Sequence, residues 1–282
     1  MQGSNIVAQE FDILILGGGS AGYSAAIRAR QLGFTVGLIE KEKVGGTCLH
    51  TGCIPTKAYL HAAELAEEAR EASKVGVNAV LQSIEMGKVR DYKDNIVSGK
   101  FKGLAGLLKM KGVEVIPGEG KLTAQDTITV NGVEYKGKNI ILASGSVSKT
   151  FGLPIEGRVL TSTEALEMDY LPKSAIVLGG GVIGCEFASM WNAMGVDVTI
   201  IEGLPHLVPN EDPAIKKRGI KFNTGTLFEK VEQDANGAKV TLADGKVFEA
   251  EIVLVAVGRG PNTANMGYEE QGIPMDRGFV LA

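Results

Sequence analysis

The stretch FDILILGGGSAG, residues 11–22, decides the fold of the N-terminal part of the chain. Its first half, Phe11–Leu16, is an apolar run that predicts a buried strand. Its second half supplies Gly17, Gly19 and Gly22, the spacing of a glycine-rich loop between a strand and a helix. The order of strand, loop and helix predicts a βαβ unit, and such units build parallel sheets.

The same design occurs again in SAIVLGGGVIG, residues 174–184. In each copy a helical segment and a second apolar strand follow the loop, and a glutamate closes the strand. The spacing from first glycine to glutamate is identical, from Gly17 to Glu40 and from Gly179 to Glu202. The repeat predicts an α/β chain with two Rossmann-like dinucleotide-binding domains, each a three-layer parallel sheet with β-hairpin additions.

The remaining pattern divides the chain into two expected domains, residues 1–150 and 151–270, with a return to the first after about residue 270. Hairpins are expected at Asn131-Gly132, as a type I′ turn, and at Asp244-Gly245. Predicted helices cover 21–32, 56–73, 85–111 and the segment ending at Met194. Predicted strands cover 35–39, 127–130, 133–135, 139–143, 196–201, 220–223, 239–242, 247–250 and 252–257.

Composition excludes several classes of protein. The 282 residues carry a net charge of −4 with both signs interspersed, so no basic stripe indicates nucleic acid. No apolar run is long enough to span a bilayer, and the polar N-terminus lacks a signal peptide pattern. Three cysteines do not make a disulfide scaffold. We therefore expect a cytoplasmic protein.

Each glycine loop has a physical role in binding a dinucleotide. The first glycine permits the tight turn, the second lets the backbone approach a pyrophosphate, and the third lets helix and strand pack closely. The helix N-terminus offers unpaired N–H groups to the phosphates. Glu40 and Glu202 are expected to hydrogen-bond ribose hydroxyls, and Glu202 with no following arginine favours NAD over NADP. The alternative is a structural turn.

The most specific stretch is GGTCLHTGCIPTK, residues 45–57. Cys48 and Cys53 lie at the predicted start of a helix, where Pro55 fits the first turn. Too few other ligands lie nearby for a tetrahedral zinc site. A helix N-terminus favours the thiolate, which is the nucleophile in thiol–disulfide exchange.

This stretch resembles the active-site signature of the pyridine nucleotide-disulfide oxidoreductases, and its CIPxK ending resembles the dihydrolipoamide dehydrogenase branch. The resemblance covers essentially the whole chain. It implies that FAD is bound by Gly17, Gly19, Ser20, Ala21, Gly22, Glu40, Lys41, Gly46, Thr47, Lys57, Gly120, Ser144, Gly145 and Ser146. It implies that NAD is bound by Gly179, Gly181, Val182, Ile183, Gly184, Glu186, Glu202, Gly258 and Arg259.

The resemblance also implies a mechanism, in which dihydrolipoamide reduces a Cys48–Cys53 disulfide. Cys48 would be the interchange thiol, and Cys53, against the flavin, would pass electrons on towards NAD. We further hypothesise that Lys57 and Glu186 pair near the flavin, where a cation stabilises reduced flavin. The implied partner is a lipoamide-bearing protein of a 2-oxoacid dehydrogenase or glycine cleavage complex, and the implied full-length form is a homodimer.

The chain departs from the family in two respects. The family continues beyond Ala282 with a dimerisation domain whose histidine acts as acid–base catalyst, so we expect the chain as written to be impaired in the thiol step. The crossover after Glu202 offers helix only over 213–218, so we expect residues to be missing or one face of the second sheet to be uncovered.

Two alternatives stay open: another disulfide reductase of glutathione or mercuric type, and a non-catalytic FAD-binding subunit of a 2-oxoacid dehydrogenase complex. Other candidate residues favour structural roles. We expect Cys185 and Trp191 in the core, and surface or structural roles for His50, His61 and His206. The lysines between Lys88 and Lys111 are expected to form a solvated helix face.

Overall fold

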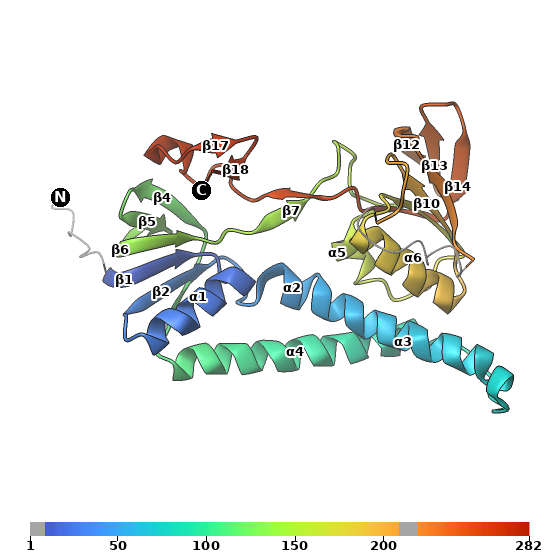
Figure 1. The fold of residues 1–282 in the computed structure, drawn as a ribbon, viewed down its shortest axis with the longest axis horizontal. Coiled ribbons are helices and arrows are strands. Elements are labelled where there is room, and N and C mark those ends of the chain that lie inside the picture. Colours follow the sequence, from blue (N-terminus) through green and yellow to red (C-terminus); the bar gives the residue numbers. More distant parts are fainter. Residues whose placement is uncertain (1–8, 209–218, 282) are drawn as a thin grey trace. The chain divides into compact units, whose positions relative to one another are not determined.

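The computed structural model describes residues 9–208 and 219–281 (Figure 1). Contacts divide the chain into two compact units. Unit 1 comprises residues 1–50, 97–147 and 260–282, and unit 2 comprises residues 51–96 and 148–259. The segment 51–96 thus packs within the second unit, and the chain returns to the first from residue 260.

Unit 1 is built on a six-stranded sheet with the order β3-β2-β1-β6-β5-β4. Strands β1, β2, β3 and β6 are parallel, and β4 and β5 extend the sheet as antiparallel strands. The bounds are β1 Gln9–Leu16, β2 Val36–Glu40, β3 Glu114–Pro117, β4 Gly120–Ala124, β5 Thr127–Val130 and β6 Val133–Leu142.

One continuous strand, β6, replaces the two short strands expected at 133–135 and 139–143. It pairs antiparallel with β5 at one end and parallel with β1 along its length. Gly137 lies where a Cβ would approach Leu14 Cβ to 2.6 Å, so the absence of a side chain lets the strand pass unbroken. The turn before it is the expected type I′, with Asn131 at φ 51° and Gly132 at φ 81°.

Helices cover one face of this sheet, and Figure 1 shows α1 and the C-terminal part of α4 on the same side. Helix α1 spans Ser20–Gln31, the short α2 spans Gly46–His50, and α4 spans Met86–Met110. Ala26 of α1 and Leu108 of α4 share one buried cluster with the sheet. A second buried cluster joins side chains of β1 to β5 with Tyr268 of the returning segment, so that segment covers apolar residues of the sheet.

Unit 2 contains a five-stranded parallel sheet with the order β11-β10-β9-β15-β8. Its strands are β8 Val159–Leu160, β9 Ser174–Leu178, β10 Asp197–Glu202, β11 Lys221–Thr224 and β15 Ile252–Val255. Helices α3 Cys53–Glu71, α5 Ser162–Ala165 and α6 Val182–Met194 pack on one face. The expected helix over 213–218 lies outside the described residues.

The other face of this sheet is covered by a separate antiparallel sheet, β12-β13-β14. The hairpin predicted around Asp244-Gly245 is formed by β13 and β14, whereas β12 was not predicted. The second copy therefore differs from the first, whose hairpin strands join the main sheet. The bounds are β12 Phe228–Gln233, β13 Ala238–Leu242 and β14 Val247–Ala250; the short strands elsewhere are β7 Ser146–Ser148, β16 Arg259–Pro261, β17 Met275–Asp276 and β18 Phe279–Val280.

Candidate functional site

The first glycine loop joins β1 to α1 in a conformation that only glycine fills easily. Gly17 has φ 108°, in the left-handed region. A Cβ on Gly22 would collide with the carbonyl oxygen of Gly17, so the third glycine lets α1 pack directly on the turn. Gly19 is the helix N-cap and makes no side-chain capping bond, which leaves first-turn N–H groups of α1 for a ligand.

The second loop repeats these features within unit 2. Gly179 has φ 103°, and a Cβ on Gly184 would collide with the Gly179 carbonyl oxygen. Gly181 caps α6 without a side-chain bond, and an added Cβ there would meet nothing within 4 Å. Each loop therefore combines uncapped helix N–H groups with room for close approach, which fits a pyrophosphate.

The two closing glutamates repeat their hydrogen bonds as well as their positions. Glu40 Oε2 accepts from Gly18 N at 2.7 Å, and Glu202 Oε2 accepts from Gly180 N at 2.6 Å. Their second oxygens accept from the backbone two residues on, at 2.9 Å and 2.7 Å. Each carboxylate is thus held beside its loop, with lone pairs left for hydroxyl donors.

A small cavity in unit 1 is lined by several of the residues that were predicted to contact FAD. Its lining includes Glu40, Lys41, Gly120 and Ser144. It also includes Asn262, which the sequence did not predict as a site residue. Asn262 Nδ2 donates to Ser144 O at 3.1 Å and its backbone N donates to Gly145 O at 3.0 Å. The returning segment therefore fixes the Ser144-Gly145 turn.

The cysteine segment follows β2 and contains the short helix α2. A Cβ on Gly46, at φ 57°, would lie 2.7 Å from Gly19 Cα, so the start of α2 lies against the first glycine loop. Cys48 is half-buried on α2. Cys53 is exposed and is the first residue of α3, which begins three residues earlier than predicted. Cys48 and Cys53 fall in different units, so their role as a pair stays a prediction.

Lys57 and Glu186 form an ion pair inside unit 2, as hypothesised. Lys57 lies one turn after Cys53 on α3, and Glu186 lies in the first two turns of α6. Their side chains are 62% and 23% exposed, so the pair is accessible from solvent. The pair links the helix that carries a cysteine to the helix that begins at the second glycine loop.

The end of β15 leads to Gly258 and Arg259. Gly258 O accepts from Lys149 N at 2.9 Å, and Arg259 donates to Ser148 Oγ at 3.2 Å. Burial lowers the pKa of the Arg259 guanidinium. These two hydrogen bonds lie at the strand pair β7–β16 and join its two segments.

Three structural expectations are confirmed, and the fourth, a solvated face of lysines between Lys88 and Lys111, fails only at Lys93. Cys185 is buried in the core, where desolvation first and the charge of Glu202 second raise its pKa to about 11. Trp191 is buried, edge-on to Phe187. His50 is structural, with its Nε2 3.0 Å from Val44 O. Lys93, however, is not on a solvated face, because it is only 2% exposed.

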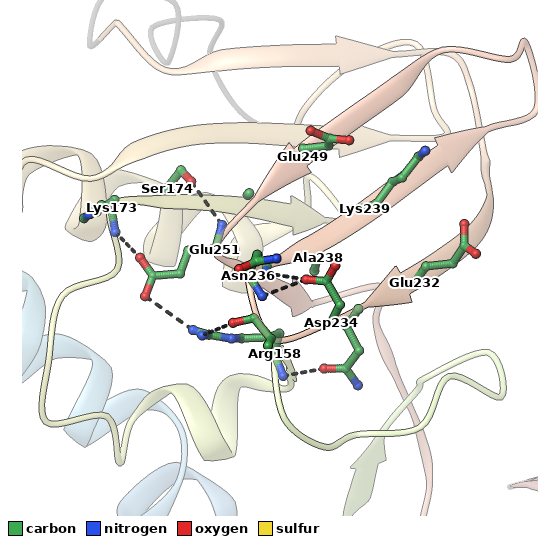
Figure 2. A pocket seen from close by; sticks show the side chains of 14 residues that line it. Arg158, Lys173, Ser174, Glu232, Asp234, Asn236, Ala238, Lys239, Glu249 and Glu251 are labelled. Atoms are coloured by element: carbon green, nitrogen blue, oxygen red, sulfur yellow. Dashed lines mark hydrogen bonds and ion pairs between the residues drawn. The ribbon is translucent and has the colours of Figure 1, made fainter.

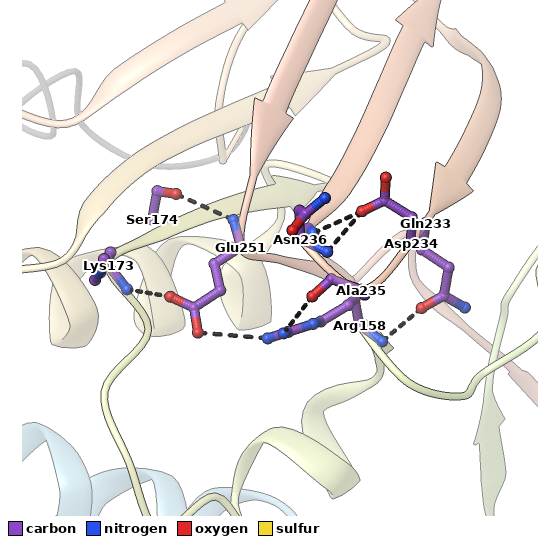
Figure 3. Close-up of polar contacts among 9 residues, drawn as sticks. Arg158, Lys173, Ser174, Gln233, Asp234, Ala235, Asn236 and Glu251 are labelled. Carbon is purple, nitrogen blue, oxygen red and sulfur yellow. Dashed lines mark hydrogen bonds and ion pairs between the residues drawn. The ribbon is translucent and has the colours of Figure 1, made fainter.

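A polar cavity of about 940 Å³ in unit 2 lies at the opposite end of the parallel sheet from the glycine loop (Figure 2). Glu251 accepts from Lys173 N at 2.8 Å and from Arg158, and its own N donates to Ser174 Oγ (Figure 3). Arg158 also donates to Ala235 O. These contacts pair the central groups with one another and tie the three-stranded sheet to the parallel sheet, so we assign this network a structural role.

Other kinds of site find no support in the part of the chain described. Within it, no group of three or more His, Cys, Asp or Glu could hold a metal ion. No helix over residues 9–208 and 219–281 is both long and apolar enough to cross a membrane.

The fold and its two loops define a chain with two Rossmann-type dinucleotide-binding folds. The sequence matches the pyridine nucleotide-disulphide oxidoreductases over residues 11–282. The chain belongs to this family, which confirms the resemblance seen in the sequence.

Among the relatives, dihydrolipoyl dehydrogenase of Bacillus subtilis is 40% identical over 97% of this chain and 64% of its own length. The structure of LpdA from Mycobacterium tuberculosis matches with a TM-score of 0.86 and 27% identity, over 96% of this chain and 63% of that one. The flavoprotein disulfide reductase RclA of Escherichia coli matches with a TM-score of 0.81 and 27% identity, over 95% and 61%. The chain thus spans a little over three-fifths of these relatives.

Proposed function

We propose that the chain is the dinucleotide-binding part of a flavin-dependent disulfide oxidoreductase that oxidises dihydrolipoamide to lipoamide and reduces NAD⁺ to NADH with release of a proton. The observation that carries the proposal is the Lys57–Glu186 ion pair, which places a cation one helical turn after Cys53. The high identity to a dihydrolipoyl dehydrogenase supports the choice of dithiol.

Residues of the chain have distinct tasks in this proposal. The uncapped N–H groups of α1 and α6 bind the two pyrophosphates, and Glu40 and Glu202 orient the riboses. Cys48 and Cys53 exchange with the substrate dithiol, and Lys57 stabilises negative charge beside the flavin. Bound FAD would carry the electron pair from the cysteines to NAD. We also propose a cytoplasmic location, a lipoamide-bearing protein as partner and a homodimeric full-length form.

The experiment is an anaerobic titration of the purified chain, supplied with FAD and then with dihydrolipoamide. The proposal expects a two-electron-reduced form with a long-wavelength band from a thiolate–flavin contact, and loss of that band in Cys53→Ser. A simple bleach of the flavin would instead favour the non-catalytic FAD-binding subunit. A chain that remains colourless with added FAD contradicts the proposal.

A second candidate is a disulfide reductase with another substrate, favoured by the structural match to RclA. The two are separated by comparing dihydrolipoamide with other thiols as reductants in the same titration. Reduction of the cysteine pair by NADH but not by dihydrolipoamide would support the second candidate.

A further inference from the structure

We propose that a buried hydrogen-bonded node positions Lys57 against Glu186. The node consists of the side chains of Tyr59 and Lys93 and the backbone carbonyl of Leu166. The inference rests on the proposed function, because Lys57 is the cation placed there beside the flavin.

The carbonyl oxygen of Leu166 accepts two hydrogen bonds from different helices. Tyr59 Oη on α3 donates at 3.0 Å, and Lys93 Nζ on α4 donates at 3.1 Å. Leu166 is the C-cap of α5, where the carbonyls lack partners within their own helix. Leu166 and the two donors are no more than 2% exposed. The node therefore ties three helices of unit 2 together at a single oxygen.

The Lys93 ammonium has three partners at this place. It donates to Leu166 O and to Glu167 Oε1 at 2.7 Å, and it is ion-paired with Asp94 Oδ1 at 2.9 Å. A buried charge is tolerated when it is paired and becomes costly when a partner moves away. Small displacements of α4 or of Leu166 are therefore opposed.

The hydrogen bond from Tyr59 fixes the position of α3 relative to Leu166 and Lys93. Burial, with the charges of Glu167 and Asp94, raises the pKa of its phenol to about 12, so the hydroxyl remains a donor at neutral pH. Lys57 lies two residues earlier, roughly 200° around the helix axis and ~3 Å along it. Anchoring Tyr59 on one side of α3 thus fixes the direction in which Lys57 leaves the other side.

The Lys57–Glu186 pair needs such support from the fold. Lys57 is 62% exposed, and exposed ion pairs contribute little energy of their own. Tyr59 packs in the same core cluster as Phe187, the neighbour of Glu186 on α6. The register between α3 and α6 is therefore set by the buried side of α3, and the exposed pair follows from it.

The test measures the reactivity of the Lys57 amine in the full chain, with and without added FAD. Competitive labelling with acetic anhydride, read by mass spectrometry, is compared for wild type, Lys93→Met and Tyr59→Phe. Loss of the node is expected to raise Lys57 labelling by a factor of about two to five, the range for a partly exposed ion pair. Lys88→Met is the matched control on α4, because Lys88 is exposed and ion-paired with Glu85 of the same segment; it should change nothing at Lys57.

The same variants in a Glu186→Gln background decide whether the node acts through the pair. There Lys57 is already released, so Lys93→Met should add no further increase. An equal increase in both backgrounds, or no increase in either variant, overturns the inference. If Lys93→Met unfolds the chain and so exposes every lysine, Tyr59→Phe is the variant that tests the node. It removes the hydrogen bond to Leu166 O and keeps the buried ring. FAD uptake is recorded separately, so a failure of the proposed function leaves the labelling result interpretable.

Discussion

Lys57 of α3 is ion-paired with Glu186 of α6, 129 residues further along the chain. Lys57 lies one turn after Cys53 on α3, and Glu186 lies shortly after the second glycine loop, at the start of α6. Because the pair is exposed, it contributes little to the free energy of folding. We therefore expect its contribution to be to the reaction.

Lys57→Met should slow reduction of bound flavin by dihydrolipoamide roughly tenfold, which corresponds to ~1.4 kcal/mol of barrier. The reason is the loss of a cation that stabilises negative charge on reduced flavin. Stopped-flow absorbance measures the rate. Lys74→Met, at an exposed pair with Glu71, is the control and should leave the rate unchanged. An unchanged rate in Lys57→Met would contradict the assigned role.

Gly22→Ala and Gly184→Ala should each destabilise the chain by about 1–3 kcal/mol or more, because the new methyl group collides with a backbone carbonyl that cannot move aside. Urea unfolding measures the change. Gly106→Ala on α4 is the contrast: its Cβ meets nothing within 4 Å, so a gain of about 0.5–1 kcal/mol is expected. Similar effects at all three positions would show that the loops are not closely packed.

Glu202→Gln should shift dinucleotide preference towards NADP by roughly tenfold, or ~1.4 kcal/mol, because it removes a carboxylate that repels the 2′-phosphate. The amide oxygen can still accept from Gly180 N, which keeps the contact to the glycine loop, whereas the bond from Leu204 N is lost because the amide nitrogen cannot accept it. Binding titrations with NAD and NADP give the ratio of the two dissociation constants. Glu229→Gln, on the exposed side of β12, should leave that ratio unaltered.

The cysteines should differ sharply in reactivity. At pH 8 a thiol reagent should modify the exposed Cys53 in the folded chain and spare Cys185, which is buried and has a pKa raised to about 11. Modification of Cys185 at the rate of Cys53 would show that α6 opens readily.

The raised pKa of Cys185 also predicts a dependence of stability on pH. The folded thiol keeps its proton up to about pH 11, whereas the unfolded thiol loses it near its ordinary value of 9.0. The folded state therefore holds more protons between these values, and its stability falls as pH rises through them. Unfolding in urea at pH 8 and pH 10.5 should show a larger loss in wild type than in Cys185→Ala.

The sequence predicted the features that repeat locally and missed those that depend on distant partners. The two glycine loops and their glutamates follow from spacing alone, and the structure gives them matching hydrogen bonds. The lysine-rich pattern of α4 does not distinguish Lys93 from its exposed neighbours. Its burial depends on Leu166, 73 residues away, which no local pattern reveals.

The boundaries that were wrong have local physical causes. Pro55 can occupy the first turn of a helix, so it did not mark the start of α3, which begins at Cys53. Two short strands were expected at 133–135 and 139–143, yet β6 is continuous, because Gly137 between them has no side chain and lets the strand pass Leu14. The relation between Cys48 and Cys53 remains a prediction from their spacing and the family resemblance.

The order of the strands in unit 1 has a consequence for how the protein is made. The central strand β1 is synthesised well before its neighbour β6, in which Tyr135 pairs with Gln9, and residues 260–281, which belong to the same unit, are synthesised after both strands. Much of unit 2 lies between these segments in the chain, so it can fold while unit 1 is still incomplete. A nascent chain stopped before residue 260 should therefore expose apolar surface of the first sheet, and chaperone demand should be greatest at that stage of translation.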